Sequence, residues 1–290
     1  MELTLITQAV INGVLIGSVY GLAALGLTLV WGIMDIVNIA HGEFILLGAY
    51  LTFVLYNLPD GGVSPLLALL IAIPAGALVG QLVFTGLLRR VLGRSGLTTL
   101  LLTFGISICL NNILLNVFSP DVRTVRWAGG SLLLGPLVVP ISRLIALGLV
   151  LVMSGVLFAF LQRSYTGKSI RAVMQDREAA ASLGINIRGV LGIAFVIGTA
   201  LAFVAGVLLS IVIPFAPATA LPYSITSFVI CVVGGLGRPL GALLGGLIVG
   251  LVENFTGTFI SQAYTPAAVS VLLITFLLLR PAGLFGWTTR

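Results

Sequence analysis

Residues 11–32 read INGVLIGSVYGLAALGLTLVWG, a stretch that is apolar almost from end to end. No charged residue lies between Glu2 and Asp35, so residues 8–32 supply the about 20 apolar residues that a membrane-spanning helix needs. The stretch is much longer than the apolar region of a signal peptide, and the acidic Glu2 precedes it where a signal peptide carries basic residues. We therefore expect this segment to be a retained membrane span.

The composition of the whole chain supports the same environment. Charged residues make up 8% of the 290 residues and hydrophobic residues 59%, whereas an ordinary globular domain is about 25% charged. Cys109 and Cys231 each lie in an apolar run, which argues against a disulfide scaffold and a cysteine metal site. The net charge of +6 comes from basic residues between the apolar runs, a pattern of membrane topology and not of nucleic-acid binding.

The intervals between charged residues divide the remaining chain into further apolar segments. These are residues 44–58, 64–88, 97–118, 144–162, 189–212, 223–236, 239–256 and 264–279. Their length and their lack of alternating polarity exclude the strands of a membrane barrel. The predicted fold is an all-α membrane protein, a polytopic helical bundle of about eight or nine spans with short broken or re-entrant helices. We expect a single transmembrane domain over residues 1–290.

The basic residues also predict the orientation. Arg89, Arg90 and Arg94 follow the third span, and five basic residues lie within 163–188, after the fifth. The positive-inside rule places both loops in the cytoplasm and the N-terminus outside. Three arginines in the 119–143 loop go against this rule: Arg123, Arg126 and Arg143.

Residues 163–188, RSYTGKSIRAVMQDREAAASLGINIR, are the only sizeable polar stretch. Asp176 suits the N-cap of a short helix, Glu178 its first turn and Gly184 a left-handed C-terminal stop. One interpretation is a pair of short amphipathic helices that bind the groove of a partner protein. The other is a solvated linker between spans.

A second polar stretch, DIVNIAHGEF at 35–44, lies between two apolar spans and contains the only histidine. Ionisable groups within a membrane usually face a cavity or a partner, and Gly42 allows the backbone to break. Asn38, His41 and Glu43 are therefore candidates for a substrate pathway. The alternative is a polar turn at the membrane surface whose side chains cap the two helices. No third ligand accompanies His41 and Glu43, so we expect no metal site.

Glycines recur at intervals of four residues, at 13, 17 and 21 and in the pairs 241/245 and 246/250. Such small faces allow close packing of membrane helices, and pore lining is the alternative. Residues 234–246, GGLGRPLGALLGG, are rich in Gly and Pro, and we expect a broken or re-entrant element there with Arg238 at its turn. No motif for catalysis or a cofactor is present, and an enzyme is not expected.

In this order, the segments resemble the permeases of branched-chain amino acid ABC importers, of the LivH type. The resemblance covers nearly the whole chain and rests on 11–32, NIAHGEF at 38–44, QDREAAASLGIN at 175–186, VVGGLGRPLGALLGG at 232–246 and RPAGLFG at 280–286. Glu178, Ala179, Ala180 and Gly184 also match EAAxxxG, the core of the coupling motif of binding-protein-dependent permeases. The Leu-Pro that ends the longer form of this motif is absent.

The resemblance implies a multi-pass permease of the bacterial inner membrane that imports branched-chain amino acids by alternating access. Its partners would be a LivM-like permease, two ATPase subunits that hydrolyse ATP, and an extracytoplasmic solute-binding protein. The residues expected to couple to the ATPases are Asp176, Arg177, Glu178, Ala179, Ala180 and Gly184. Urea, short amides and other amino acids are alternative solutes. A proton-coupled secondary transporter using His41 and Glu43 is the alternative from another class.

Overall fold

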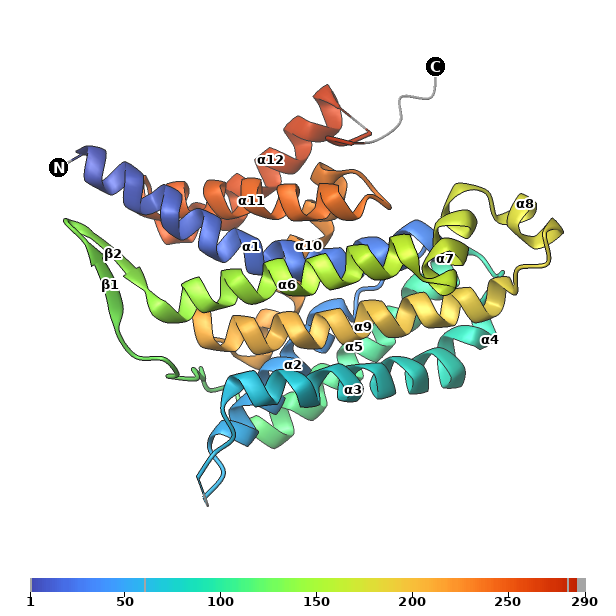
Figure 1. The fold of residues 1–290 in the computed structure, drawn as a ribbon, viewed down its shortest axis with the longest axis horizontal. Helices are drawn as coiled ribbons and strands as arrows, with labels where there is room; N and C mark the ends of the chain where they lie inside the picture. The colour runs from blue at the N-terminus through green and yellow to red at the C-terminus, as the bar shows by residue number, and fades with distance from the viewer. Residues whose placement is uncertain (1, 60, 281, 286–290) are drawn as a thin grey trace.

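The computed structural model describes residues 2–59, 61–280 and 282–285 as a helical bundle with a small hairpin at one end (Figure 1). The helices are α1 (Glu2–Met34), α2 (His41–Tyr56), α3 (Pro65–Val83), α4 (Arg89–Val91), α5 (Gly96–Phe118), α6 (Ile141–Arg163), α7 (Tyr165–Gln175), α8 (Arg177–Ser182), α9 (Ile187–Val212), α10 (Ala220–Gly234), α11 (Pro239–Phe259) and α12 (Thr265–Leu279). A π-helical turn (Phe84–Leu88) joins α3 to α4, and short 3-10 turns (Pro217–Thr219, Gln262–Tyr264) precede α10 and α12. Strands β1 (Ser131–Leu134) and β2 (Leu137–Pro140) pair antiparallel, with Leu132 opposite Val139.

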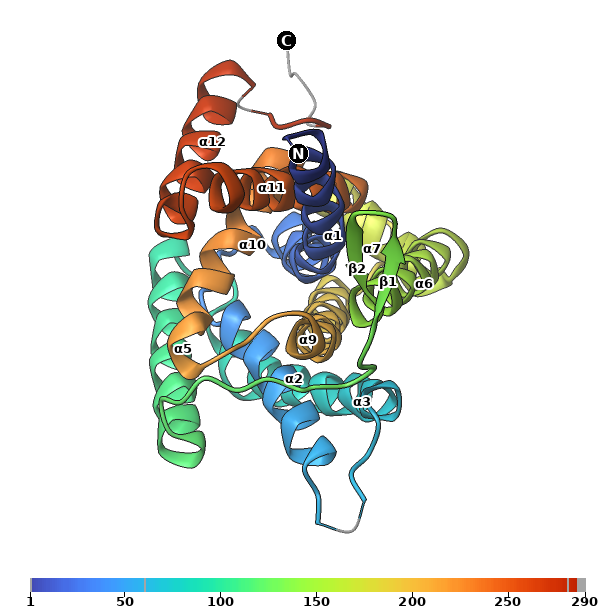
Figure 2. The same ribbon diagram turned by 90° about the vertical axis from the view of Figure 1, so that its left-hand side faces the viewer.

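Among the described residues, eight helical segments are long and apolar enough to cross a membrane, and the shorter apolar α2 accompanies them. The predicted polytopic bundle is confirmed, and each predicted apolar segment corresponds to one of these helices. Helices α1 and α9 lie at the centre and are buried over most of their length, whereas α5 and α12 lie outside and are largely exposed (Figure 2).

The repeated glycines allow α1 and α11 to pack with their backbones in contact. A Cβ atom at Gly13 would lie 2.9 Å from Leu251 Cα, and one at Gly17 would lie 3.0 Å from Leu247 Cα. No ordinary side chain fits between the helices at these positions. The packing interpretation of the glycine spacing is thus confirmed.

The chain contains two similar halves of opposite direction. Helix α1 leads into an irregular stretch, 35–40, and then into the short α2; α9, which runs antiparallel to α1, leads into 213–219 and then into the short α10 (Figure 1). Helix α1 packs on α11 of the other half, and α9 packs correspondingly on α3. Each central helix thus packs on a helix of the other half. This is the arrangement of inverted repeats, which place broken helices near the middle of a membrane.

The glycine-rich stretch at 234–246 is broken, as expected. Helix α10 ends at Gly234 and α11 begins at Pro239, so the break is a turn between two helices, and the re-entrant alternative does not apply. Gly235 and Gly237 adopt φ angles of 101° and 70°, which the turn requires. The position of Arg238 at the turn is as expected. In this half the irregular stretch within the bundle is 213–219, before α10.

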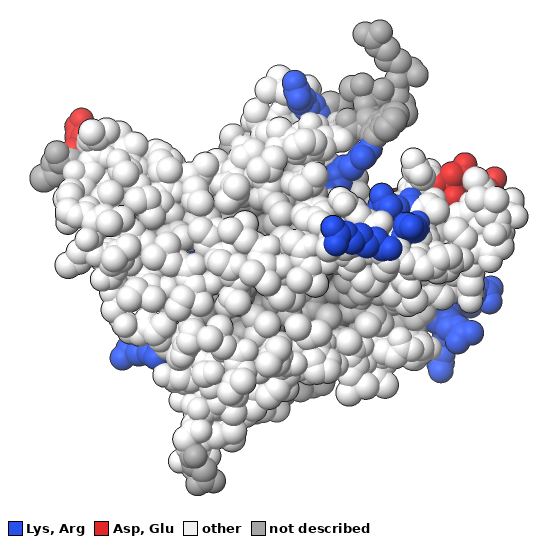
Figure 3. All heavy atoms as spheres, in the orientation of Figure 1, with Lys and Arg blue, Asp and Glu red and all other residues white. Residues whose placement is uncertain are grey.

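The expected basic loops lie at one end of the bundle, here called the α8 end. The end of α1, the α10–α11 turn and α7 meet there, since a Cβ at Gly32 would lie 2.7 Å from Gly237 Cα and would also contact Met174. Figure 3 shows Lys and Arg side chains gathered toward this end. At the hairpin end, Arg143 Nη1 donates to Asn12 Oδ1 at 2.8 Å and Arg123 pairs with Asp121 at 3.3 Å. These contacts within the protein account for two of the three arginines that go against the positive-inside rule.

Candidate functional site

The two short helices α2 and α10 touch at their N-terminal ends inside the bundle. Gly42 N donates to Ser224 Oγ at 2.7 Å, and Ser224 Oγ donates to Ile39 O at 2.6 Å. His41 Nε2 donates to Ala23 O of α1 at 2.9 Å, which places the start of α2 about 16 Å along the axis from the end of α1. Residues 35–40 therefore turn back into the bundle. We call this region, with Asn38, His41, Glu43, Ser107 and Ser224, the polar crossing.

The absence of a side chain at Gly42 makes this contact possible. A Cβ atom there would lie 2.7 Å from Ser224 Oγ and 2.8 Å from the carbonyl carbon of Ala220, and closer still to the carbonyl oxygen. Two of these atoms belong to the backbone of α10. The expected break lies just before Gly42, at 35–40, whereas Gly42 itself is helical in the first turn of α2. Its missing side chain permits the close approach of the second short helix.

Glu43 is an acidic side chain enclosed by protein, only 1% exposed. Its Oε1 accepts a hydrogen bond from Ser107 Oγ of α5 at 2.5 Å. Its Oε2 is buried and has no hydrogen-bond partner among the described residues. A buried carboxyl oxygen without a partner is costly, so such groups usually serve a ligand or a change of state.

Helix α5 covers the polar crossing with a row of polar side chains. Thr103 Oγ1 donates to Val37 O at 3.1 Å and accepts from Ile39 N at 3.4 Å, and Asn111 Nδ2 donates to Pro217 O at 2.8 Å. Thr103, Ser107 and Asn111 are spaced by four residues and so share one face of α5. Thr103 and Ser107 were missed as site residues from the sequence, although their spacing with Asn111 was a usable signal.

The three residues expected along a substrate pathway are all buried at the polar crossing. Asn38 is 4% exposed and its carbonyl oxygen accepts from His41 N at 3.3 Å, while His41 is 1% exposed. The side chain of His41 contacts α1 and that of Glu43 contacts α5. A polar turn at the membrane surface, the alternative for this stretch, is incompatible with this depth and burial. No group of three metal-binding side chains is present in the described part of the chain.

The polar segment 163–188 folds into two short helices, α7 and α8, as expected, and α8 is exposed to solvent over most of its length. Asp176 caps α8, because its Oδ1 accepts from Glu178 N at 2.9 Å and from Ala179 N at 3.0 Å. Gly184 ends the segment with a φ of 82°. Ala180 is buried, whereas Glu178 and Ala179 are exposed. The expected N-cap, first-turn acid and glycine stop are confirmed.

One side chain connects α8 to the central helix of the bundle. Arg177 Nη2 donates to Ile33 O at 2.5 Å, in the last turn of α1. A cation at this position satisfies a carbonyl group that the helix end leaves unpaired and interacts favourably with the helix dipole. Residues 35–40 follow directly, so α8 contacts the end of α1 from which the segment toward the polar crossing begins.

Residues 9–280 match the model of a protein family described as "Branched-chain amino acid transport system / permease component". The chain belongs to this family. It is similar to the high-affinity branched-chain amino acid transport system permease proteins BraD of Pseudomonas aeruginosa and LivH of Escherichia coli, each 33% identical over 96% of this chain and 95% of the relative. LivM of E. coli is 27% identical over 93% of this chain and 68% of its own length. No solved structure matches the chain.

Membership in this family confirms the resemblance found in the sequence, and it makes the chain a multi-pass transport permease. Its relatives are named as permease components of a transport system. The chain is similar in sequence to permeases of two names, LivH and LivM.

Proposed function

We propose that the chain is the LivH-like permease subunit of an ATP-driven importer for branched-chain amino acids in the bacterial inner membrane. It works with a LivM-like permease, two ATPase subunits and an extracytoplasmic solute-binding protein. Support comes from the names of its relatives, which match over almost their full lengths. The observation that carries the proposal is the separate helix α8 at the basic end of the bundle.

Helix α8 has the properties of a docking element for an ATPase. It is capped at both ends, exposes Glu178 and presents Leu183, which is 81% exposed, just beyond its last turn. A carrier that is complete in itself has no need of such a helix. The positive-inside rule places this end in the cytoplasm, where ATP is hydrolysed.

The polar crossing provides the chemistry for a zwitterionic amino acid. The free oxygen of Glu43 suits an ammonium group, and the N-terminal ends of α2 and α10 carry partial positive charge that suits a carboxylate. Only four residues of α5 are buried, namely Thr99, Thr103, Ser107 and Leu114. Three of these four side chains carry hydroxyl groups, and a substrate can replace the hydrogen bonds of Thr103 and Ser107 when α5 moves.

Co-purification tests the subunit assignment. The tagged chain is extracted from its native membrane in mild detergent, and the bound proteins are identified by mass spectrometry. We expect two ATPase subunits and a second permease. Recovery of the chain alone, with proton-driven uptake after reconstitution, would contradict the importer and favour a secondary transporter.

Neutralising Glu43 tests the substrate pathway. We expect Glu43→Gln to lower leucine uptake by the reconstituted transporter by about ten- to hundredfold, the value of a hydrogen bond to a charged group. The matched control is Asp35→Asn, which removes the same charge from an exposed residue whose φ of 54° asparagine also tolerates. Unchanged uptake by Glu43→Gln would exclude the carboxylate from the pathway, whereas an equal loss in both variants would point to general damage.

A further inference from the structure

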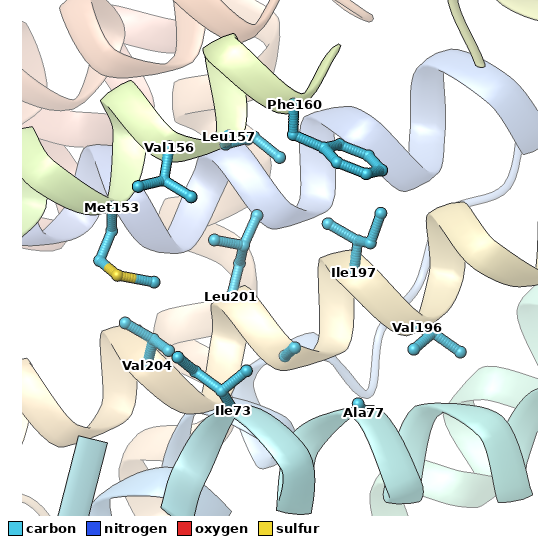
Figure 4. A pocket seen from close by; sticks show the side chains of 11 residues that line it. Ile73, Ala77, Met153, Val156, Leu157, Phe160, Val196, Ile197, Leu201 and Val204 are labelled. Carbon is cyan, nitrogen blue, oxygen red and sulfur yellow. The ribbon is translucent and has the colours of Figure 1, made fainter. Parts of the chain in front are cut away.

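An apolar groove runs along the outside of the bundle, with α9 as its floor and α3 and α6 as its walls (Figure 4). Its volume is about 290 Å³, and all 11 lining residues are apolar, among them Ile73, Ala77, Met153 and Phe160. The walls are membrane spans, so the groove opens toward the bilayer.

A polar pocket of about 430 Å³ lies at the α8 end, between the end of α3 with α4 and the start of α9. Arg89 and Arg188 line it together with Gln81, Thr85 and Asn186, and no acidic residue takes part. Within the described residues, both arginines are exposed and neither side chain forms an ion pair or hydrogen bond. The positive end of the α9 dipole adds to their charge.

The pocket and the groove follow one another along the same two helices. On α3 the groove reaches Ala77 and the pocket begins at Gln81; on α9 the pocket reaches Ile193 and the groove begins at Val196. These steps are about one helical turn each. A basic pocket at the membrane surface therefore continues directly into an apolar groove within the membrane.

We propose that the pocket and groove form a binding site for an anionic phospholipid. The phosphate of the headgroup lies between Arg89 and Arg188, and an acyl chain lies in the groove over α9. Basic pockets between spans on the cytoplasmic side suit anionic headgroups because unpaired cations face the anionic lipid surface. The groove favours a lipid over a soluble phosphate, because a soluble phosphate has no acyl chain to occupy the apolar groove. This site is separate from the polar crossing and from α8.

Native mass spectrometry of the intact transporter in detergent, titrated with phosphatidylglycerol or phosphatidylcholine, tests the headgroup. We expect preferential binding of phosphatidylglycerol. Two arginines near an anionic headgroup are together worth about thirtyfold in affinity, so the double variant Arg89→Gln/Arg188→Gln loses that preference. The control Arg90→Gln removes one positive charge from the neighbouring residue outside the pocket and retains the preference. Equal preference in the double variant and the control would overturn the proposal.

A second comparison tests the acyl chain. Ala77→Phe fills the groove and lowers phosphatidylglycerol binding, whereas Leu78→Phe, at a neighbouring position that is 61% exposed and outside the groove, does not. Inorganic phosphate serves as the competing anion. Displacement of the lipid by phosphate with no effect of Ala77→Phe would identify a simple anion pocket and refute a lipid site.

Discussion

A methyl group at Gly42 is expected to separate the two short helices on which the polar crossing depends. In Gly42→Ala the new Cβ would lie 2.7 Å from Ser224 Oγ and 2.8 Å from Ala220 C, and within collision distance of Ala220 O. Ser224 can rotate, but the Ala220 atoms belong to the backbone of α10. The start of α10 must therefore move away from α2.

Two effects lower the stability of the Gly42→Ala protein. Overpacking a tight interior costs about 1–3 kcal/mol, and leaving the buried Gly42 N–H without Ser224 Oγ costs about 1–3 kcal/mol more. The higher helix propensity of alanine stabilises α2 by up to about 1 kcal/mol and offsets part of this loss. We expect the free energy of unfolding to fall by roughly 3 kcal/mol, or about 5–10 °C in the midpoint of thermal unfolding.

The assay is the fraction of monodisperse protein that remains after heating in detergent, measured by size-exclusion chromatography together with leucine uptake. The control is Gly148→Ala in α6, where a Cβ atom meets nothing within 4 Å. Alanine there is expected to be neutral or stabilising by up to about 1 kcal/mol. If Gly42→Ala matches this control in both stability and uptake, α2 and α10 do not meet as described.

Two further substitutions test the connection of α8 and the packing of α1. Arg177→Gln removes the cation at the end of α1, and we expect uptake to fall several-fold while ATP hydrolysis continues. The control Arg171→Gln, on the exposed side of α7, leaves both activities unchanged. Equal effects of the two substitutions would exclude a specific link between α8 and α1. In Gly17→Val the new side chain collides with backbone atoms of α11 and pushes α1 away from it. We expect the free energy of unfolding to fall by roughly 3 kcal/mol or more, measured by the same heating assay. A Gly17→Val protein as stable as the unmodified chain would show that the two backbones are not in contact.

Features controlled by local sequence could be predicted well. Apolar runs between charges identify the spans because burying an unpaired charge in lipid is costly. The cap at Asp176 and the stop at Gly184 follow from backbone groups within a few residues. Both features require no knowledge of the distant chain.

Features that depend on distant partners could not be predicted. The depth of the 35–40 turn is fixed by Ser224, which is 182 residues from Gly42, and by Thr103 and Ser107 of α5. Likewise, glycine at 241 permits close packing while glycine at 237 permits a turn with φ of 70°, and composition alone cannot separate these uses. For this reason the sequence left open whether 234–246 would be broken or re-entrant, and the structure shows a break at 235–238.

The contacts suggest how movement at α8 would reach the polar crossing under the proposed mechanism. The backbones of α1 and α11 are in direct contact, so no flexible side chains separate the two helices. A movement of α8 that is passed through Arg177 to Ile33 would therefore move α1 as a rigid body. The first non-helical element after α1 is the segment 35–40. Thr103 of α5 donates a hydrogen bond to this segment at Val37 O, and α5 is largely exposed. A shift of this segment would break the contacts of α5 before it disturbed the centre of the bundle. In that order of events Ser107 leaves Glu43 and the carboxylate becomes accessible, so the exposed α5 is the element expected to open the pathway.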